Sequence, residues 1–303
     1  MENNTYYKQV KLLVQLLPLV AEEPCFALKG GTAINLFIRE LPRLSVDIDL
    51  VYLPMQGRNE ALEGITSALT RISKRIQKAL PKSKIIEVFR DMHDAMRLIV
   101  SHQGTQIKIE LSPVLRGTVY EPILMSVCKK VEDEFGFAEV PVVSLEDIYA
   151  GKICAALDRQ HPRDLFDVKI LLENEGITEN IRKALIVYII SHSRAIVELF
   201  NPIEKDISDL YDGEFKNMAF VSTSLNSLEE SRKELIQIIN ESLLDNEKAF
   251  LLSFKNKVPD WGLLDLEGIK DLPAVRWKLE NLHRMKADKH ALAYNKLESH
   301  LLP

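Results

Sequence analysis

The spacing of hydrophobic and polar positions changes along the chain and predicts a mixed first half and a helical second half. Apolar residues three and four positions apart predict amphipathic helices over residues 6–20 and 58–80. Short or alternating apolar runs predict strands at 25–28, around Asp47, and at 95–101, 105–111 and 141–143. The second half shows almost only helical spacing, over 178–200, 203–212, 224–244, 246–257, 272–285 and 287–300. We therefore predict an α+β fold, with a mixed sheet and flanking helices in residues 1–175 and a helical domain in residues 176–303.

The stretch between the first two predicted strands carries a pair of aspartates. Asp47 and Asp49 flank Ile48 in the second strand, and alternation along a strand places both carboxylates on one face. Two carboxylates held this close repel each other unless a cation lies between them. Mg²⁺ takes oxygen ligands and is commonly shared with substrate phosphates. The pair is therefore a candidate metal site.

A glycine turn precedes the aspartates at a predicted strand-to-helix junction. Lys29, Gly30, Gly31 and Thr32 follow the first strand, and a helix is expected over 33–40. Glycines let the backbone approach a phosphate closely, and a helix N-terminus presents unpaired N–H groups to an anion. An isolated Asp-x-Asp, or a lone Gly-Gly turn, is common on solvated surfaces. The two features in this order favour a site that binds both a phosphate and a metal ion.

Composition limits the function classes. The 303 residues are 46% hydrophobic and 27% charged, as in an ordinary soluble globular protein. The net charge of −5 means that any nucleic-acid contact must be local. Cys25, Cys128 and Cys154 are widely spaced, which fits buried thiols in a reducing compartment better than disulfides or zinc. The N-terminus is unlike a signal peptide and no apolar run approaches the ~20 residues that span a bilayer, so we expect a cytosolic protein without membrane contact.

Two stretches are locally basic. Residues 71–90 contain seven Lys or Arg and one acid, Glu87, and residues 276–300 contain six Lys or Arg and three acids, with Trp277 and Tyr294 interleaved. Each stretch can be an ordinary solvated helix face or a surface that contacts RNA phosphates. The sequence leaves both alternatives open.

The sequence of the glycine turn and of the aspartate strand resembles a known family. Lys29-Gly30-Gly31-Thr32-Ala33, followed by Leu41-Pro42-Arg43-Leu44-Ser45-Val46-Asp47-Ile48-Asp49-Leu50, is similar to the nucleotidyltransferase superfamily and in particular to the AbiEii/AbiGii toxins of type IV toxin–antitoxin systems. The resemblance implies a nucleotidyltransferase-like mixed sheet followed by a helical domain. It also implies Mg²⁺ as cofactor and an NTP as co-substrate.

The resemblance assigns roles to residues of the first half. Asp47 and Asp49 would bind the metal, and Glu110, in the predicted strand 105–111, would be a third ligand or the general base. Without the resemblance, Glu110 would pass as a surface residue of a hairpin. The residues expected at the nucleotide are Lys29, Gly30, Gly31, Thr32 and Ser45.

A second block, Gly151 to Leu157 and then Pro162 to Asp167, also matches the family pattern. By that resemblance, Lys152 would contact the triphosphate and Asp164 would orient or help bind the nucleotide. A lysine suits phosphate charge as a mobile cation. Asp164 can equally be a helix N-cap in a structural ion pair with Arg163. His161 is interpreted as a turn residue.

The implied reaction transfers NMP from an NTP to an acceptor hydroxyl. By resemblance the acceptor is RNA, with the 3′ end of tRNA favoured, the outcome is blocked translation, and a cognate antitoxin is encoded nearby. Ser45 lies on the same strand face as Asp47, and we hypothesise that its phosphorylation would repel the triphosphate. The alternatives are a small-molecule nucleotidyltransferase, such as an antibiotic-modifying enzyme, and a non-catalytic module with the same fold.

Overall fold

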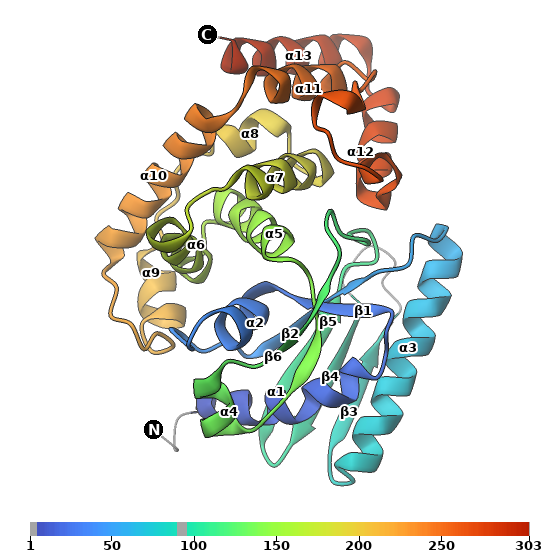
Figure 1. The fold of residues 1–303 in the computed structure, drawn as a ribbon, viewed down its shortest axis with the longest axis vertical. Coiled ribbons are helices and arrows are strands. Elements are labelled where there is room, and N and C mark those ends of the chain that lie inside the picture. The colour runs from blue at the N-terminus through green and yellow to red at the C-terminus, as the bar shows by residue number, and fades with distance from the viewer. Residues whose placement is uncertain (1–4, 90–95, 303) are drawn as a thin grey trace. The chain divides into compact units, whose positions relative to one another are not determined.

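The computed structural model describes residues 5–89 and 96–302, and its contacts divide the chain into two compact units (Figure 1). The first unit comprises Met1–Ser144 with Lys216–Ser222, and the second comprises Leu145–Phe215 with Thr223–Pro303. Arg90, the last cation of the basic stretch 71–90, and Ala95, the first residue of a predicted strand, lie outside the described residues.

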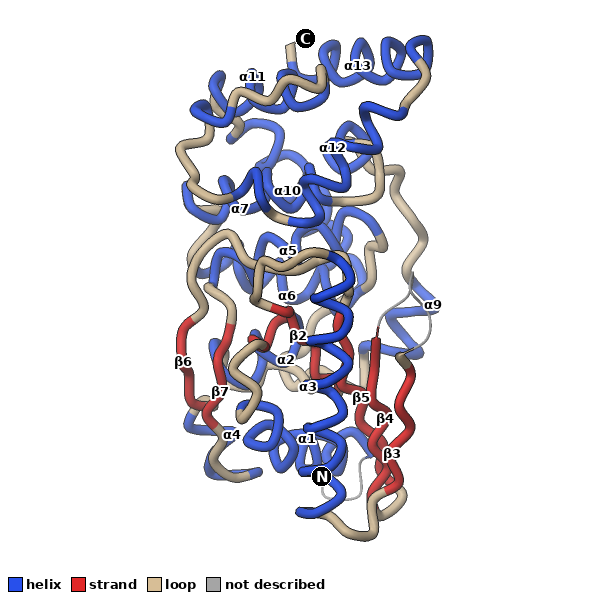
Figure 2. The backbone as a smooth tube through the Cα atoms, turned by 90° about the vertical axis from the view of Figure 1, so that its right-hand side faces the viewer, coloured by secondary structure: helices blue, strands red, loops and turns tan. Residues whose placement is uncertain are grey.

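A seven-stranded mixed sheet forms the centre of the first unit (Figure 2). Its strands are β1 (Phe26–Lys29), β2 (Asp47–Tyr52), β3 (Lys84–Val88), β4 (Met96–His102), β5 (Thr105–Leu111), β6 (Ile123–Ser126) and β7 (Glu139–Val142). The order across the sheet is β3-β4-β5-β2-β1-β7-β6. The β1–β7 and β2–β5 pairs are parallel and the other pairs are antiparallel. The prediction of a mixed sheet is confirmed.

Alternation along the central strands separates an apolar face from a polar one. Ile107, Ile109 and Leu111 of β5 are buried, whereas Lys108 is exposed and Glu110 is half-buried. Helices α1 (Thr5–Ala21) and α3 (Arg58–Ala79) contact each other and the strands, and both carry rows of fully buried aliphatic side chains. Their apolar spacing, visible in the sequence, matches this packing.

The helix after the glycine turn begins earlier than predicted. A turn of α-helix, α2 (Gly30–Ala33), continues directly into a π-helical turn, η1 (Ile34–Ile38). Gly30 has φ +75°, so the chain enters the helix through a conformation that glycine adopts without strain. The structure also contains β3, β6 and helix α4 (Lys129–Phe135), which the hydrophobic pattern does not predict.

The second unit contains only helices among its described residues. They are α5 (Leu145–Asp158), α6 (Pro162–Asn174), α7 (Glu179–Ser191), α8 (Ile196–Phe200), α9 (Ser208–Leu210), η2 (Tyr211–Phe215), α10 (Leu225–Ser242), α11 (Asp245–Lys255), η3 (Trp261–Leu263), η4 (Ile269–Asp271), α12 (Pro273–Arg284) and α13 (Ala287–Leu301). The boundary between the compact units lies at residue 144, earlier than the predicted boundary at 175. The reason is that α5 packs on α7 and α6 packs on α10, so both join the later helices.

Residues 216–222 return to the first unit and pair with the segment before β2. Arg43 and Ala219 form an antiparallel bridge. The Leu44 amide donates to the Met218 carbonyl oxygen at 2.8 Å, and the Phe220 amide donates to Pro42 at 2.9 Å. These bonds fix the approach to the Asp-x-Asp strand. No helix in the described part of the chain is both long and apolar enough to cross a bilayer.

Candidate active site

Strand register brings the predicted carboxylates of the first unit together. Lys29 of β1 pairs with Asp49 of β2, and Asp49 pairs with Glu110 of the parallel strand β5. Arg97 of β4 continues this row beside Glu110, because it is the antiparallel partner of that residue. Paired residues in adjacent strands project from the same face. The sheet therefore carries a row of two cations and two carboxylates, all half-buried.

Asp47 lies in the next row on the same face. It is half-buried and pairs with the exposed Lys108 of β5. Alternation places Asp47 and Asp49 side by side along β2, as the sequence predicts. Asp47, Asp49 and Glu110 thus share one face over two adjacent strands.

The glycine turn lies directly against the Asp49 carboxylate. A methyl group added at Gly30 would lie 2.5 Å from Asp49 Oδ2, a distance that real contacts do not allow. The positive φ of Gly30 also disfavours any other residue. The sequence requires glycine here because the backbone of the turn and the carboxylate occupy adjoining space. This close approach is the geometry expected where one ligand contacts both.

The second glycine lies against a buried arginine that the sequence analysis did not select. A methyl group at Gly31 would lie 2.8 Å from Arg43 Nη2 and 3.0 Å from Ser45 Oγ. Arg43 is 2% exposed and donates from Nη1 to the Leu44 carbonyl oxygen. A guanidinium beside a glycine turn is well suited to phosphate binding. The sequence signal that could have indicated Arg43 is its position four residues before Asp47, in the segment that leads into β2.

Thr32 anchors the turn to the strand. Its hydroxyl, fully buried, donates to the Asp47 carbonyl oxygen at 2.5 Å and lies 3.0 Å from Ser45 Oγ. Ser45 is itself buried. Both hydroxyls therefore already have protein contacts that hold the turn in place, and their predicted contact with a nucleotide stays a prediction.

Lys29 lies in the electrostatic field of the carboxylates. Burial of its ammonium lowers the pKa of Lys29, and the nearby carboxylates of Asp49 and Glu110 oppose this shift. The side chain thus supplies positive charge on the same face as the metal-binding candidates. The contact of Lys29 with the nucleotide stays a prediction.

The donor set fits Mg²⁺ that is shared with a nucleotide. Carboxylate oxygens are the ligands that Mg²⁺ prefers, and the turn at Gly30 leaves no room for a side chain beside Asp49. Among the described residues, no three His, Cys, Asp or Glu side chains already converge as a metal cage. Mg²⁺ is usually bound by one or two carboxylates together with substrate phosphates and waters. Asp47 and Asp49 fit that arrangement, and Glu110 as a third ligand stays a prediction.

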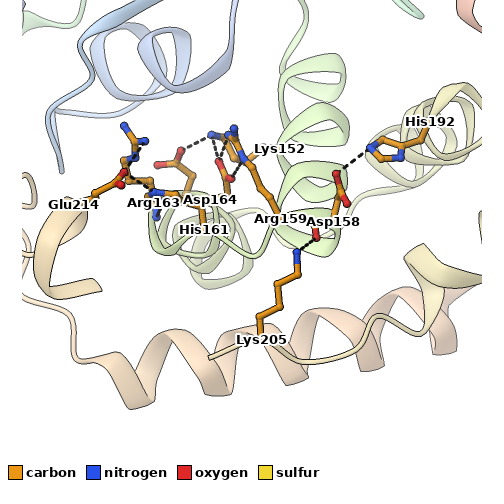
Figure 3. A network of polar contacts seen from close by, with 10 residues as sticks. Lys152, Asp158, Arg159, His161, Arg163, Asp164, His192, Lys205 and Glu214 are labelled. Atoms are coloured by element: carbon orange, nitrogen blue, oxygen red, sulfur yellow. Dashed lines mark hydrogen bonds and ion pairs between the residues drawn. The ribbon is translucent and has the colours of Figure 1, made fainter. Parts of the chain in front are cut away.

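Lys152 and Asp164 lie together in the second unit, in a buried cluster (Figure 3). Lys152 Nζ lies 2.8 Å from Asp164 Oδ1 and 3.0 Å from Asp167 Oδ2. The exposed fractions of the three side chains are 7%, 1% and 0%. Arg159 adds a second cation, with Nη2 3.0 Å from Asp164 Oδ1. Burial alone would raise the pKa of Asp164, but Lys152 and Arg159 hold it well below its usual range.

The residues around Asp164 explain the start of helix α6. His161 is the N-cap, since its Nδ1 accepts from the Arg163 amide at 3.1 Å, and its Nε2 contacts Glu214 Oε2 at 3.1 Å (Figure 3). With Nδ1 as acceptor, the proton of a neutral ring lies on Nε2 and donates to Glu214. Burial lowers the pKa of His161 despite this carboxylate. The N-cap is therefore His161, and Asp164 contacts Lys152 and Arg159.

Two of the six described cations of the basic stretch 71–90 have structural partners. Arg71 and Arg75 form ion pairs with Glu23 at 2.6 and 2.7 Å, and Arg75 also pairs with Glu22 at 2.8 Å. Among the described residues, the remaining lysines of the stretch, Lys74, Lys78, Lys82 and Lys84, have no ion pair. The surface available to an RNA phosphate is therefore smaller than the sequence count indicates.

Comparisons with known proteins identify the family and the fold of the chain. A model of the family described as nucleotidyl transferase AbiEii toxin, Type IV TA system, matches residues 11–281. The fold is similar to that of MenT4, a nucleotidyltransferase toxin from Mycobacterium tuberculosis H37Rv, with a TM-score of 0.61 at 15% sequence identity. That match covers 91% of this chain and 93% of the MenT4 chain. No curated protein matches the sequence significantly. Because the family model spans most of the chain, the protein belongs to the AbiEii family of nucleotidyltransferase toxins of type IV toxin–antitoxin systems.

Proposed function

We propose that the protein transfers a nucleoside monophosphate from an NTP to a hydroxyl at the 3′ end of an RNA, with Mg²⁺ as cofactor and tRNA as the acceptor. One observation carries the proposal. The glycine turn meets the Asp49 carboxylate so closely that a Cβ at Gly30 would lie 2.5 Å from Oδ2, while register places Glu110 beside Asp49. A phosphate held by the turn would therefore lie beside carboxylates able to share a metal ion with it.

Each residue of the first unit has a proposed task. The backbone of Gly30 and Gly31 binds the triphosphate, and Lys29 and Arg43 contribute positive charge. Asp47 and Asp49 hold Mg²⁺. When bound, the ion supplies charge neutralisation for the phosphates and for the leaving group.

The proposed reaction is an in-line displacement at the α-phosphorus. The acceptor oxygen forms a new phosphodiester bond, the bond from the α-phosphorus to the bridging oxygen breaks, and pyrophosphate leaves with the electron pair. The hydroxyl proton passes to a carboxylate, and Glu110 is the proposed base because it lies beside Asp49 on the same face. The chain thus positions the reactants and accepts one proton.

Family membership supports the biological setting. A type IV toxin acts with an antitoxin, so we propose a cognate antitoxin encoded nearby and growth arrest through modified tRNA. Lys74, Lys78, Lys82 and Lys84 of the first unit give the RNA proposal local positive charge.

The test incubates the purified full chain with each labelled NTP, Mg²⁺ and total cellular RNA. Wild type is compared with Asp49→Asn, which preserves the size of the side chain and removes its charge. Asp133→Asn is the matched control, because Asp133 is an exposed carboxylate of the same unit that pairs with Lys129 on the surface of α4. We expect labelled tRNA-sized RNA with wild type and Asp133→Asn, and a loss on the order of a thousandfold with Asp49→Asn.

Two outcomes would contradict the proposal. If Asp49→Asn transfers label as fast as wild type, the Asp-x-Asp strand is not the metal site. If no NTP labels RNA while a small hydroxyl compound such as an aminoglycoside is labelled, the acceptor class is wrong and the small-molecule alternative replaces it.

A further inference from the structure

A cavity of about 200 Å³ in the second unit lies outside every feature used so far. It is lined by residues of α8, the end of α11 and α13. Its charged lining residues are Lys255, Lys289, Lys296 and Glu198. Three lysines against one glutamate leave a formal surplus of two positive charges around a small cavity.

Lys255 is the unusual member of this group. The residue is 5% exposed, and its ammonium has no hydrogen bond or ion pair within residues 5–89 and 96–302. Burial lowers the pKa of Lys255, with Lys257 acting in the same direction. A largely buried lysine that lines a cavity and has no protein partner is available to an anionic ligand in that cavity.

Two other largely buried lysines of the second unit, Lys278 and Lys152, do have partners. Lys278 donates from Nζ to the carbonyl oxygens of His192, Ser193 and Arg194 at 2.6, 3.3 and 2.5 Å. Lys152 contacts two carboxylates, as described above. Lys289 and Lys296 are exposed, unlike Lys255, and neither has an ion pair in the described part of the chain. The three lysines thus line one cavity, and no protein group of the described residues pairs with their ammonium groups.

The walls of the cavity are held by polar contacts. His290 Nε2 contacts the Lys255 carbonyl oxygen at 2.7 Å and ties the end of α11 to α13. Lys278 holds the turn that leads into α8. The remaining lining is apolar and includes Val197 and the largely exposed Leu292. The site thus combines a cationic pocket with an apolar rim.

We propose that this cavity binds the terminal phosphate of a nucleotide, with the phosphate against Lys255, Lys289 and Lys296 and the sugar along the apolar rim. A phosphate monoester carries a charge of roughly −1.5 to −2 at neutral pH. That charge matches the surplus of the lining better than a single carboxylate or a backbone phosphodiester does. The volume suits a phosphate with part of a pentose, and the ligand's remainder would extend into solvent.

Two sources share this chemistry, a free nucleoside monophosphate and the 5′-phosphate end of an RNA chain. The site does not depend on the transfer reaction of the first unit. A direct binding measurement on the full chain therefore tests it separately from the proposed function.

The test measures binding of a short 3′-labelled oligoribonucleotide with a 5′-phosphate and of the same oligonucleotide with a 5′-hydroxyl, without Mg²⁺ or NTP. We expect wild type to prefer the phosphorylated form by roughly tenfold or more. The Lys289→Gln/Lys296→Gln double variant and Lys255→Met should lose that preference. The control is Lys286→Gln, because Lys286 is exposed at the start of α13 and does not line the cavity. This variant should keep the preference for the phosphorylated oligonucleotide.

Competition by AMP against adenosine separates the two sources. If AMP competes and its effect needs Lys289 and Lys296, a free nucleotide is a sufficient ligand. If only the RNA end shows the preference, RNA is the ligand. Either result supports the phosphate site. The Asp49→Asn variant should show the same preference for the 5′-phosphate and the same competition by AMP as wild type.

Three results would overturn the proposal. Equal wild-type affinity for the two oligonucleotides would show that the terminal phosphate is not recognised. A preference that persists in the Lys255 and Lys289/Lys296 variants would place recognition elsewhere. Loss of the preference in Asp49→Asn would move it to the first unit. The Lys255→Met protein should unfold at an equal or higher temperature than wild type, since it replaces a largely buried lysine that has no partner by an apolar side chain of similar length.

Discussion

The two units use aspartates in contrasting ways. In the second unit, Asp164 and Asp167 are sealed from solvent and share Lys152 at 2.8 and 3.0 Å. In the first unit, Asp47 and Asp49 are half-buried on one face of the sheet, in rows that include a lysine. Both sets match family motifs in the sequence, but their surroundings differ.

The buried aspartates of the second unit stabilise the structure, whereas the half-buried aspartates of the first unit can contact a ligand. A buried ion pair has little access to substrate, and removing one partner leaves an uncompensated charge inside the protein. Carboxylates on an accessible face, beside a turn that excludes a Cβ, can exchange their contacts for a metal ion and a phosphate. We therefore propose that the chemistry belongs to the first unit, and the variants below test the role of the second.

The largest expected effect is the loss of stability in Lys152→Met. The substitution keeps the length of the side chain but leaves Asp164 and Asp167 buried without their shared cation. We expect the free energy of unfolding to fall by about 3–5 kcal/mol, measured by urea denaturation. Lys169→Met is the control, because Lys169 pairs one turn along α6 with the more exposed Glu173. Unchanged stability together with lost transfer would favour the predicted triphosphate contact instead.

Gly30→Ala tests the close approach in the first unit. The added methyl group would lie 2.5 Å from Asp49 Oδ2, and φ is +75°. We expect a cost of roughly 1–3 kcal/mol in stability and a larger relative loss of transfer, because Asp49 must move. Gly104→Ala has nearly the same backbone strain, with φ +78°, but open space around the added methyl group. Equal transfer by the two variants would mean that the approach to Asp49 does not matter.

Acid should weaken the second unit through Asp164. Its pKa is lowered in the folded protein, so its contribution to stability is complete above the ordinary value of 3.8 and is lost as the pH falls below it. Unfolding free energies of wild type should therefore decline below about pH 4 more steeply than those of Asp164→Asn. Parallel pH curves for the two proteins would argue against the ion pairs.

The smallest expected change is in Ser45→Ala. The substitution removes a hydroxyl that lies 3.0 Å from Thr32 Oγ1, and should cost about 1 kcal/mol in stability. If Ser45 contacts the nucleotide, the KM for NTP should also rise. Ser45→Glu, which imitates phosphorylation, should lose transfer by repelling the triphosphate, and full activity in that variant would remove the phosphorylation hypothesis.

Local patterns in the sequence predict the glycine turn and the aspartate strand well, because each depends on a few neighbouring residues. The sequence predicts less well which residues from other elements contact them. Register across β2 and β5 decides that Glu110 lies beside Asp49, and packing of α5 on α6 decides that Lys152 meets Asp167. Neither contact leaves a periodic signal in the chain.

The elements absent from the prediction have a physical reason in common. Strands β3 and β6 form the two edges of the sheet and are mostly exposed, so their sequences lack the apolar alternation of a half-buried strand. The backbone partner of Arg43 is Ala219, in segment 216–222, far away along the chain. Such features follow from tertiary contacts and not from local spacing.

The returning segment 216–222 has a consequence for synthesis. A ribosome completes the first 144 residues long before it makes Ala219, the bridge partner of Arg43. Arg43 lies against Gly31, and the segment that carries it has no strand partner in the nascent chain until helices α5 to η2 have been translated. For a protein of a toxin family, this order means that the candidate active site reaches its final form only when most of the polypeptide exists.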